Sequence, residues 1–416
     1  MLSLAFGVIA ALAPTSHAQP SGEAIKLGLN YPATGRYQQE GIAQAQGALM
    51  AIAEINASNG ILGRPVELLT ANSASDPVRA VDNVNSLAQQ GAAMLFGGAS
   101  SAVAVAASKA AAQRDLLYFG TLTYANETTG ADGHRHMFRE TYNAHMAAKA
   151  LARYLNEAEA DKTYFYLTAD YNWGWSTESS LRTFTNTADT SRHQGALVTF
   201  PRPRESDMQA ALEQARASKA DVLVLIQFGD DMAMALTVAR RMGLHETMTI
   251  VVPNLTLNMA KKAGSGIMEG VIGAAPWVWQ VPYRYGFTRG QQFVEAYVAR
   301  YGHYPSSSAA SAYSIVYQFK AAAERAQSLD TSKLIAALEG HRYTLLKDEQ
   351  EWRAFDHQNV QSVYVIRSRP RLDILQTHLH EDYFDILLQL PANEATPTRV
   401  EWEAQRRSAN QPLSLQ

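Results

Sequence analysis

The chain has 416 residues, of which 47% are hydrophobic and 18% are charged, and it contains no cysteine. Its 36 Lys and Arg residues against 39 Asp and Glu residues give a formal net charge of −3, which argues against a nucleic-acid-binding protein because such proteins carry a basic excess. The absence of cysteine excludes disulfides, thiolate metal sites and cysteine nucleophiles. The length favours two domains over a single core.

The first segment has the pattern of a secretory signal peptide. An apolar run over 2–13 is too short to span a bilayer, which needs about twenty residues. Small residues at Ser16 and Ala18 then form a cleavage site before Gln19. No Lys or Arg precedes the run, which a misplaced start codon would explain; the alternative is an ordinary buried N-terminal segment. The pattern predicts that residues 1–18 are removed and that the mature chain is exported.

The rest of the chain alternates between apolar runs of strand length and amphipathic stretches of helix length. Strands are predicted, in chain order, over 25–30, 66–70, 94–96, 116–119, 163–167, 195–200, 221–226 and 248–252. Helices are predicted between them over 41–55, 76–90, 101–114, 145–155, 175–185, 206–217 and 232–241. The run DVLVLI at 221–226 is almost wholly apolar, as strands buried on both faces of a parallel sheet are. This alternation predicts an α/β fold with parallel sheets, and no repeat of 20–50 residues indicates a solenoid.

The first two predicted helices have clear sequence signals. In the first helix, the apolar residues that recur close to every 3.6 positions are Ile42, Ala45, Leu49, Ile52 and Ile55, which predicts one buried face. The second helix opens with Asp76 at its cap and Pro77 in its first turn.

Ligand sites in parallel sheets lie beyond the carboxyl ends of the strands, where helices begin. Ser100 and Ser101 stand at such a junction, and the unpaired N–H groups of a helix start favour a bound carboxylate. Plain N-capping is the alternative for both serines. Phe228 and Asp230 follow the 221–226 strand, so they are expected at the same edge; Asp230 is either a helix cap or a partner for a ligand ammonium group.

Aromatic residues gather near several of these junctions. Tyr171 and Trp173 stand at one turn, and the others are Tyr31, Tyr37, Trp175, Trp277 and Trp279. Aromatic rings with a polar tip suit a cleft that encloses a small ligand, although each ring taken alone is more often part of a core. We select Tyr171 and Trp173 as ligand-binding candidates.

Several segments together resemble one protein family. They are GLNYPATG at 28–35, AEIN at 53–56 followed by NGILGRPVEL at 59–68, DP at 76–77, GGASS at 97–101, YNWG at 171–174 and MEGV at 268–271. In this order and spacing they resemble the type I periplasmic solute-binding proteins of ABC importers, in the branched-chain amino acid and amide branch. The resemblance runs from about residue 24 to residue 366.

The resemblance implies a two-lobed α/β fold with three crossovers and a ligand trapped between the lobes. Lobe one would comprise 24–141 plus 277–345, and lobe two 142–276 plus 346–416. The segment after Arg367 is long for the family and is expected to form peripheral strands and a loose tail.

The resemblance also assigns roles to residues. The turn with Ser100 and Ser101 would grip a ligand carboxylate, and Thr121 and Thr123 would hold a polar end of the ligand, for which a plain turn is the alternative. Tyr171 would close over the ligand from the other lobe.

One departure affects the choice of ligand. Amino-acid binders of the family place an acidic residue in the loop after the strand that corresponds to 248–252, whereas the loop 253–258 reads PNLTLN here. A buried ammonium group needs an opposite charge or a full set of acceptors. An amide, a urea-like compound or an aromatic or aliphatic acid is therefore a rival to an α-amino acid.

Signals for catalysis are weak. No G-x-S-x-G nucleophile turn occurs, and the His134/His136 and His378/His380 pairs have no evident third metal ligand. We therefore expect no enzyme, no cofactor and no metal, but an exported, periplasmic binding component that captures a small amino acid, amide or related carboxylate for an ABC permease in the inner membrane. A ligand-sensing regulator of the same fold is the alternative, and a periplasmic hydrolase is a weaker one.

Overall fold

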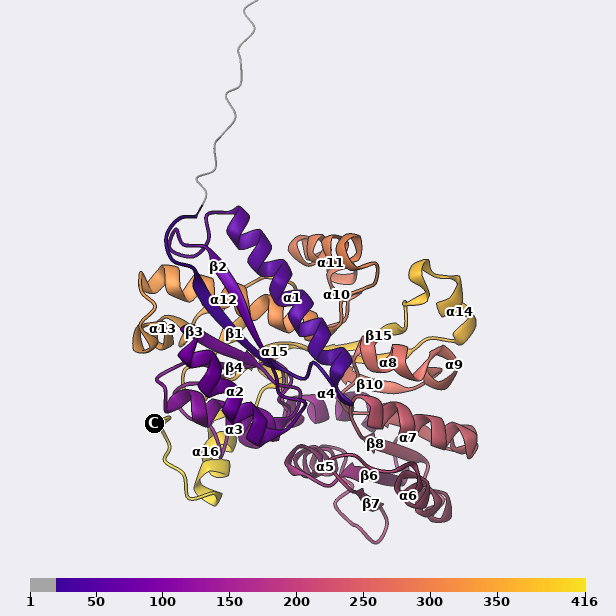
Figure 1. Cartoon of the computed structure of the whole chain (residues 1–416). Helices are drawn as coiled ribbons and strands as arrows, with labels where there is room; N and C mark the ends of the chain where they lie inside the picture. The colour runs from indigo at the N-terminus through magenta and orange to yellow at the C-terminus, as the bar shows by residue number, and fades with distance from the viewer. Residues whose placement is uncertain (1–19) are drawn as a thin grey trace, which may run out of the picture.

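A computed structural model of the chain describes residues 20–416, so the predicted signal peptide at 1–18 lies outside the described residues. Two large sheets occupy separate parts of the molecule, each covered by helices (Figure 1). This arrangement confirms the predicted α/β class with parallel sheets. Within 20–416, no helix has both the length and the apolar character needed to cross a membrane.

The first large sheet has five strands in the order β2-β1-β3-β4-β5, and every pairing in it is parallel. Its strands are β1 (Ile25–Tyr31), β2 (Val66–Asn72), β3 (Ala92–Gly97), β4 (Tyr118–Gly120) and β5 (Met137–Arg139). The helical segments between them are α1 (Gln38–Ala57), α2 (Pro77–Gln89), α3 (Ser101–Ala112) and the short η1 (Asn126–Thr128). Asp76 caps α2 through bonds from two backbone N–H groups, as its sequence signal predicts.

The second large sheet has seven strands in the order β15-β14-β10-β9-β8-β6-β7. Its strands are β6 (Tyr164–Ala169), β7 (Gln194–Val198), β8 (Val222–Ile226), β9 (Thr249–Val252), β10 (Ile272–Ala275), β14 (Val363–Ser368) and β15 (Phe384–Leu390). Its helical segments are α4 (Ala144–Ala158), α5 (Asn172–Phe184), α6 (Glu205–Ser218), α7 (Asp230–Arg241), η2 (Leu244–Glu246), α8 (Leu257–Ala263), α9 (Ser265–Met268), α14 (Arg371–Gln376) and η3 (His378–His380). Only β14 and β15 run antiparallel to their neighbours. β15 forms the edge, which confirms a peripheral strand after Arg367.

The residues between β10 and β14 return to the first sheet. They form α10 (Val281–Tyr285), α11 (Thr288–Tyr301), α12 (Ser307–Ala326), α13 (Thr331–Leu338) and a small sheet of β11 (Arg342–Tyr343), β12 (Gln350–Trp352) and β13 (Asn359–Val360). α12 packs along α1. The buried ring of Trp352 lies 5.6 Å from Phe119 and 5.7 Å from Phe138, so this small sheet shares the core of the first one.

The chain passes between the two large sheets at four places. These passages follow β5, β10, β13 and β15, at about 140–143, 276–280, 361–362 and 391–398. The division into two lobes at 141/142, 276/277 and 345/346 stays a prediction. The first two of these limits fall at passages, whereas the contacts of Trp352 favour a third limit near 361.

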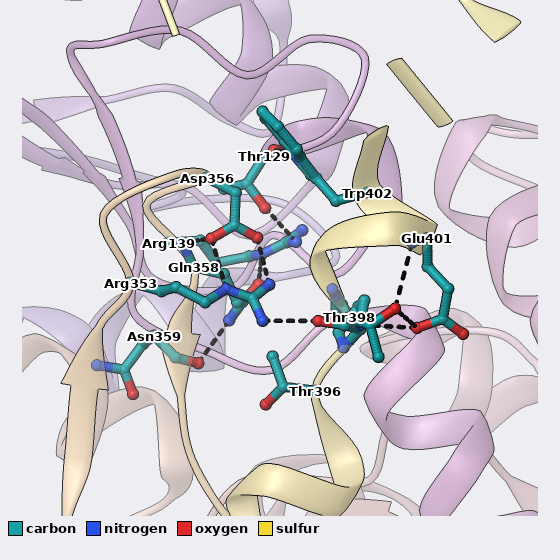
Figure 2. Close-up of polar contacts among 12 residues, drawn as sticks. Thr129, Arg139, Arg353, Asp356, Gln358, Asn359, Thr396, Thr398, Glu401 and Trp402 are labelled. Carbon is teal, nitrogen blue, oxygen red and sulfur yellow. Dashed lines mark hydrogen bonds and ion pairs between the residues drawn. The ribbon is translucent and has the colours of Figure 1, made fainter. Parts of the chain in front are cut away.

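The prediction of a loose C-terminal tail is wrong for most of its length. After α15 (Ala392–Ala395), helix α16 (Arg399–Ser408) packs against the segment that follows η1 in the first part of the chain. Trp402 Nε1 donates to the Thr129 carbonyl at 2.9 Å, and both residues are drawn in Figure 2. Arg406 Nη1 donates to the Gly130 carbonyl at 2.7 Å. Trp402 and Arg406 are four residues apart, so both point from the same helix face into the protein. Thr398 and Glu401 close the start of α16 as a capping box.

Candidate functional site

A cavity of about 770 Å³ lies between loops that follow strands of the two large sheets. The loops after β1, β2 and β3 form one wall, and the loops after β7 and β8 form the other. Tyr37 and Ser100 belong to the first wall, Phe200 and Asp231 to the second. The cavity therefore lies at the carboxyl ends of parallel strands, where ligand sites of such sheets are found.

The loop after β1 touches the opposite wall through Arg36. The guanidinium of Arg36 pairs with the Asp231 carboxylate at 2.7 Å and donates to the Pro203 carbonyl at 3.2 Å. The Arg36 carbonyl also accepts a bond from the Asp230 N–H at 3.2 Å. Burial raises the pKa of Asp231 to about 6, although Arg36 opposes this rise. The two walls are thus joined by a charge pair whose acid titrates in a mildly acidic range.

Aromatic rings from both walls meet at Phe228. Its ring lies 5.3 Å from Tyr37, 5.8 Å from Tyr124 and 6.1 Å from Trp173, in edge-on geometry each time. Tyr37 and Tyr124 follow strands of the first sheet, whereas Trp173 and Phe228 follow strands of the second. Edge-on pairs of this kind add about 0.5–1.5 kcal/mol each beyond the area they bury. Both parts of the molecule contribute to this cluster, and Tyr37 connects it to the cavity.

Tyr171 lies beside this cluster at the start of α5. Its ring stacks on Phe200 at 3.7 Å and lies 5.8 Å from Trp173. Burial raises the pKa of Tyr37 well above its ordinary value, and the neighbouring phenol of Tyr171 raises it further. Both phenols therefore stay protonated at neutral pH and serve as neutral hydrogen-bonding groups.

The two candidate serines differ in how their hydroxyls are used. Ser101 Oγ accepts a bond from the buried Ala125 N–H at 3.0 Å, so its hydroxyl supports the fold. Ser100 precedes α3, is 2% exposed, and its Oγ has no hydrogen-bond partner anywhere in 20–416. Ser100 also lines the cavity. Its hydroxyl and the free N–H groups at the start of α3 can donate to a carboxylate or carbonyl oxygen.

The two candidate threonines are buried, and both hydroxyls are engaged within the protein. Thr121 Oγ1 donates to the Gly98 carbonyl at 2.8 Å, and Thr123 Oγ1 bonds Thr128 Oγ1 at 2.8 Å. The Gly98 bond fixes the turn that carries Ser100. These contacts favour a supporting role for both threonines behind that turn.

The acidic pair at the start of α7 divides between two environments. Asp230 is partly exposed, and its carboxylate lies 3.6 Å from Lys262 Nζ. Asp231 is buried and lines the cavity. Successive helix residues point about 100° apart, which explains why adjacent positions differ so much.

Asn254, in the loop after β9, is 1% exposed, and neither polar atom of its side chain has a partner among the described residues. Two residues later, Thr256 Oγ1 donates at 2.6 Å to the buried Glu40 carboxylate, which also accepts bonds from Asn258 and Ser308. Burial raises the pKa of Glu40. An unsatisfied buried amide costs about 1–3 kcal/mol per group, so Asn254 is positioned for a partner that the protein itself does not supply.

A family model for periplasmic binding proteins matches residues 24–371. The chain belongs to this family. It is a type I periplasmic binding protein of the branched-chain amino acid branch, which confirms the family predicted from the sequence motifs. Proteins of this kind are the substrate-binding components of ABC transporters for amino acids or related ligands.

Its relatives are similar over most of their length. A Leu/Ile/Val-binding protein homologue of Brucella abortus is 26% identical over 298 residues, which cover 68% of this chain and 72% of the relative. The crystal structure of a periplasmic binding protein from Burkholderia mallei shares the fold with a TM-score of 0.82 at 23% identity, and covers 91% of this chain and 97% of that one. A branched-chain amino acid transporter substrate-binding protein of Streptococcus pneumoniae, solved with isoleucine, gives 0.74 at 20% identity, with 88% and 100% covered.

The predicted site residues of this binding protein fall into two groups. Ser100 and the aromatic residues Tyr171, Trp173 and Phe228 lie at the cavity or in the cluster beside it. The others, Ser101, Thr121, Thr123 and Asp230, have side chains already bonded or paired within the protein.

Sequence reasoning did not select three residues that the structure makes candidates in the binding protein. Arg36 and Asp231 join the two walls, and Asn254 presents a buried, unpartnered amide. The loop of Asn254 could have been selected from its place after a parallel strand. Nothing in the sequence separates Asp231 from Asp230, because both are acidic residues in the first turn of one helix.

The His134/His136 pair of the binding protein makes other contacts. His134 Nε2 bonds Ser108 Oγ at 3.1 Å, and His136 Nε2 pairs with Asp115 at 3.0 Å. Within 20–416, no group of three His, Asp or Glu side chains has the arrangement that a metal ion needs.

Proposed function

We propose that the protein captures a small amino acid, amide or related carboxylate in the 770 Å³ cavity and delivers it to an ABC permease in the inner membrane. The observation that carries this proposal is the buried, unpartnered hydroxyl of Ser100, which lines the cavity. A second buried, unpartnered polar group, the Asn254 amide, follows a strand of the other large sheet. A ligand that bonds both groups would hold the two parts together.

The chemistry of these groups narrows the ligand. Ser100 at the start of α3 favours a carboxylate or carbonyl oxygen. Asn254 offers one acceptor and two donors without charge, so it suits a neutral amide, urea or hydroxyl group better than an ammonium group. The Glu40 carboxylate already accepts bonds from Thr256, Asn258 and Ser308. We therefore rank carboxylates and carboxamides without an α-ammonium group above α-amino acids.

A thermal-shift screen tests the proposal. Matched sets would each contain an amino acid, its amide, and the acid that lacks the amino group, for both aliphatic and aromatic side chains. A ligand that binds only the folded protein raises the melting temperature, by an amount that grows with its concentration over Kd. Calorimetric titration of the hits gives Kd. A flat response across all sets would refute the proposed ligand class.

A further inference from the structure

One lysine ammonium group lies where three of the four passages between the sheets meet. Lys347, in the loop between β11 and β12, is 3% exposed. Its Nζ donates to the Pro276 carbonyl at 2.7 Å, to Gln361 Oε1 at 2.7 Å and to the Ser362 carbonyl at 3.0 Å. Pro276 belongs to the second passage, and Gln361 and Ser362 form the third.

Gln361 extends this network to the first passage. While its Oε1 accepts from Lys347, its Nε2 donates to the Glu140 carbonyl. Glu140 directly follows β5, where the chain first leaves the five-stranded sheet. The three passages are thus linked to each other through one ammonium group and one amide.

The number of donors matches the number of acceptors only when Lys347 is charged. An ammonium group has three N–H donors, and Lys347 uses all three. A neutral amine has two, so deprotonation leaves one of the three passage acceptors without its bond. Because the acceptors are buried, water cannot replace the lost bond without a cost in free energy.

The surroundings of Lys347 include few charges. Within 20–416, no carboxylate lies within ion-pair distance of Lys347 Nζ. The acidic groups that act on it are Asp348, in the same loop, and Glu140. The Tyr364 ring of β14 lies 5.6 Å from Lys347 Nζ. Burial lowers the pKa of Lys347 to about 8, although Asp348 and Glu140 oppose this.

We propose that the three linked passages form a hinge and that Lys347 is its positioning residue. The ammonium group of Lys347 holds the passages in one mutual arrangement and so sets the range over which the two parts open. The effect of Lys347 on ligand affinity rests on the proposed function. The hinge geometry itself can be measured without any ligand, so the two proposals fail independently.

The experiment uses the absence of native cysteine, because two introduced cysteines are then the only labelling sites. Gln89→Cys on α2 and Gln214→Cys on α6 place one spin label on each part, at exposed positions. Pulsed electron spin resonance then gives the distribution of distances between the labels in ligand-free protein. The variants are Lys347→Met, Gln361→Leu, and Lys333→Met as a matched control at an exposed lysine.

At pH 7 we expect one narrow distribution for the parent and for Lys333→Met, and a broader one that extends to longer distances for Lys347→Met. At pH 9.5, above the Lys347 pKa of about 8, the parent should broaden and Lys347→Met should not change further. Deprotonation of the parent removes one buried bond and should weaken its affinity for a ligand found by screening by roughly two- to tenfold. Lys347→Met removes all three bonds and should weaken the affinity at pH 7 by at least this factor.

If Lys347→Met does not fold, the pH series of the parent and the behaviour of Gln361→Leu decide. Gln361→Leu cuts the link to the first passage and should broaden the distribution at pH 7. A distribution that is the same for parent, Lys347→Met and Gln361→Leu, or a parent that shows no change between pH 7 and pH 9.5, would overturn the proposal.

Discussion

Replacing the two neighbouring serines in turn separates ligand binding from structural support. Ser100→Ala removes a hydroxyl that is 2% exposed and has no bond to the described residues, whereas Ser101→Ala removes the acceptor of the buried Ala125 N–H. A hydrogen bond to a charged ligand group contributes about 1.5–3 kcal/mol, which corresponds to roughly a ten- to hundredfold change in Kd. We expect Ser100→Ala to lose this much affinity with no loss of stability.

Ser101→Ala should show the reverse pattern. An unsatisfied buried N–H group costs about 1–3 kcal/mol of folding free energy. The melting temperature should therefore fall, while Kd changes less than in Ser100→Ala. Calorimetric titration with the best ligand from the screen, together with thermal unfolding of both variants, measures the two effects. If Ser100→Ala binds within about twofold of the parent, a change of only about 0.4 kcal/mol, the cavity assignment of Ser100 is refuted.

Three further predictions concern specificity, pH and packing. Asn254→Asp should raise the ratio of the affinity for an amine-bearing ligand to that for its amine-free analogue by about tenfold or more, because the new carboxylate pairs with an ammonium group. Calorimetric titration of the parent and the variant with one matched pair of ligands measures this ratio. The pKa of Asp231 is raised from 3.8 to about 6 in the folded protein, so the folded state holds this proton more tightly than the unfolded state does. Its stabilising contribution to the unfolding free energy is therefore complete below pH 3.8 and is lost as the pH rises through about 6. Urea unfolding at several pH values should show this decrease in the parent and not in Asp231→Asn. Gly47→Leu should destabilise the fold by about 1–3 kcal/mol, whereas Leu49→Gln, at a position that is 42% exposed, should stay within about 0.5 kcal/mol in thermal unfolding.

Helix α1 shows why the alternation of elements was predictable and the packing face was not. The periodicity indicated a helix there, and Ile52 and Ile55 are buried as expected, but Ile42 and Leu49 are exposed. A Cβ on Gly47 would clash with the Ala309 carbonyl of α12, so the two helix backbones approach closely. The close approach selects the face with glycine and alanine, and a pattern that counts only large apolar residues does not detect it.

The site was predictable to the level of the loop and not of the side chain. Position after a parallel strand selected the turn at 97–101 and the start of α7, and residues of both border the cavity. The choice between Ser100 and Ser101, or between Asp230 and Asp231, depends on which neighbour already satisfies each polar group, and that is settled only by tertiary contacts. The C-terminal helix was missed for the same reason, because Trp402 and Arg406 are informative only once Thr129 and Gly130 lie beneath them.

Closure of the two parts around a ligand follows from how little holds them together directly. The direct contacts between the two parts include the Arg36–Asp231 pair, in which the Arg36 side chain is 37% exposed, the bond from Thr256 to Glu40, and the Tyr37–Phe228 ring contact. In net terms the charge pair contributes about 0–1 kcal/mol, the ring contact about 0.5–1.5 kcal/mol and the bond to the Glu40 carboxylate about 1.5–3 kcal/mol. Because these contributions are small, we expect the open and closed arrangements to be close in free energy without ligand. Moving an equilibrium that starts near 1:1 to 99:1 requires about 2.7 kcal/mol of differential binding. A charge-assisted bond at Ser100 and a neutral bond at Asn254 would together supply about 2–4.5 kcal/mol if both form only when the two parts are close. The unpartnered groups that we propose for ligand recognition are therefore also the groups that we expect to make closure depend on the ligand.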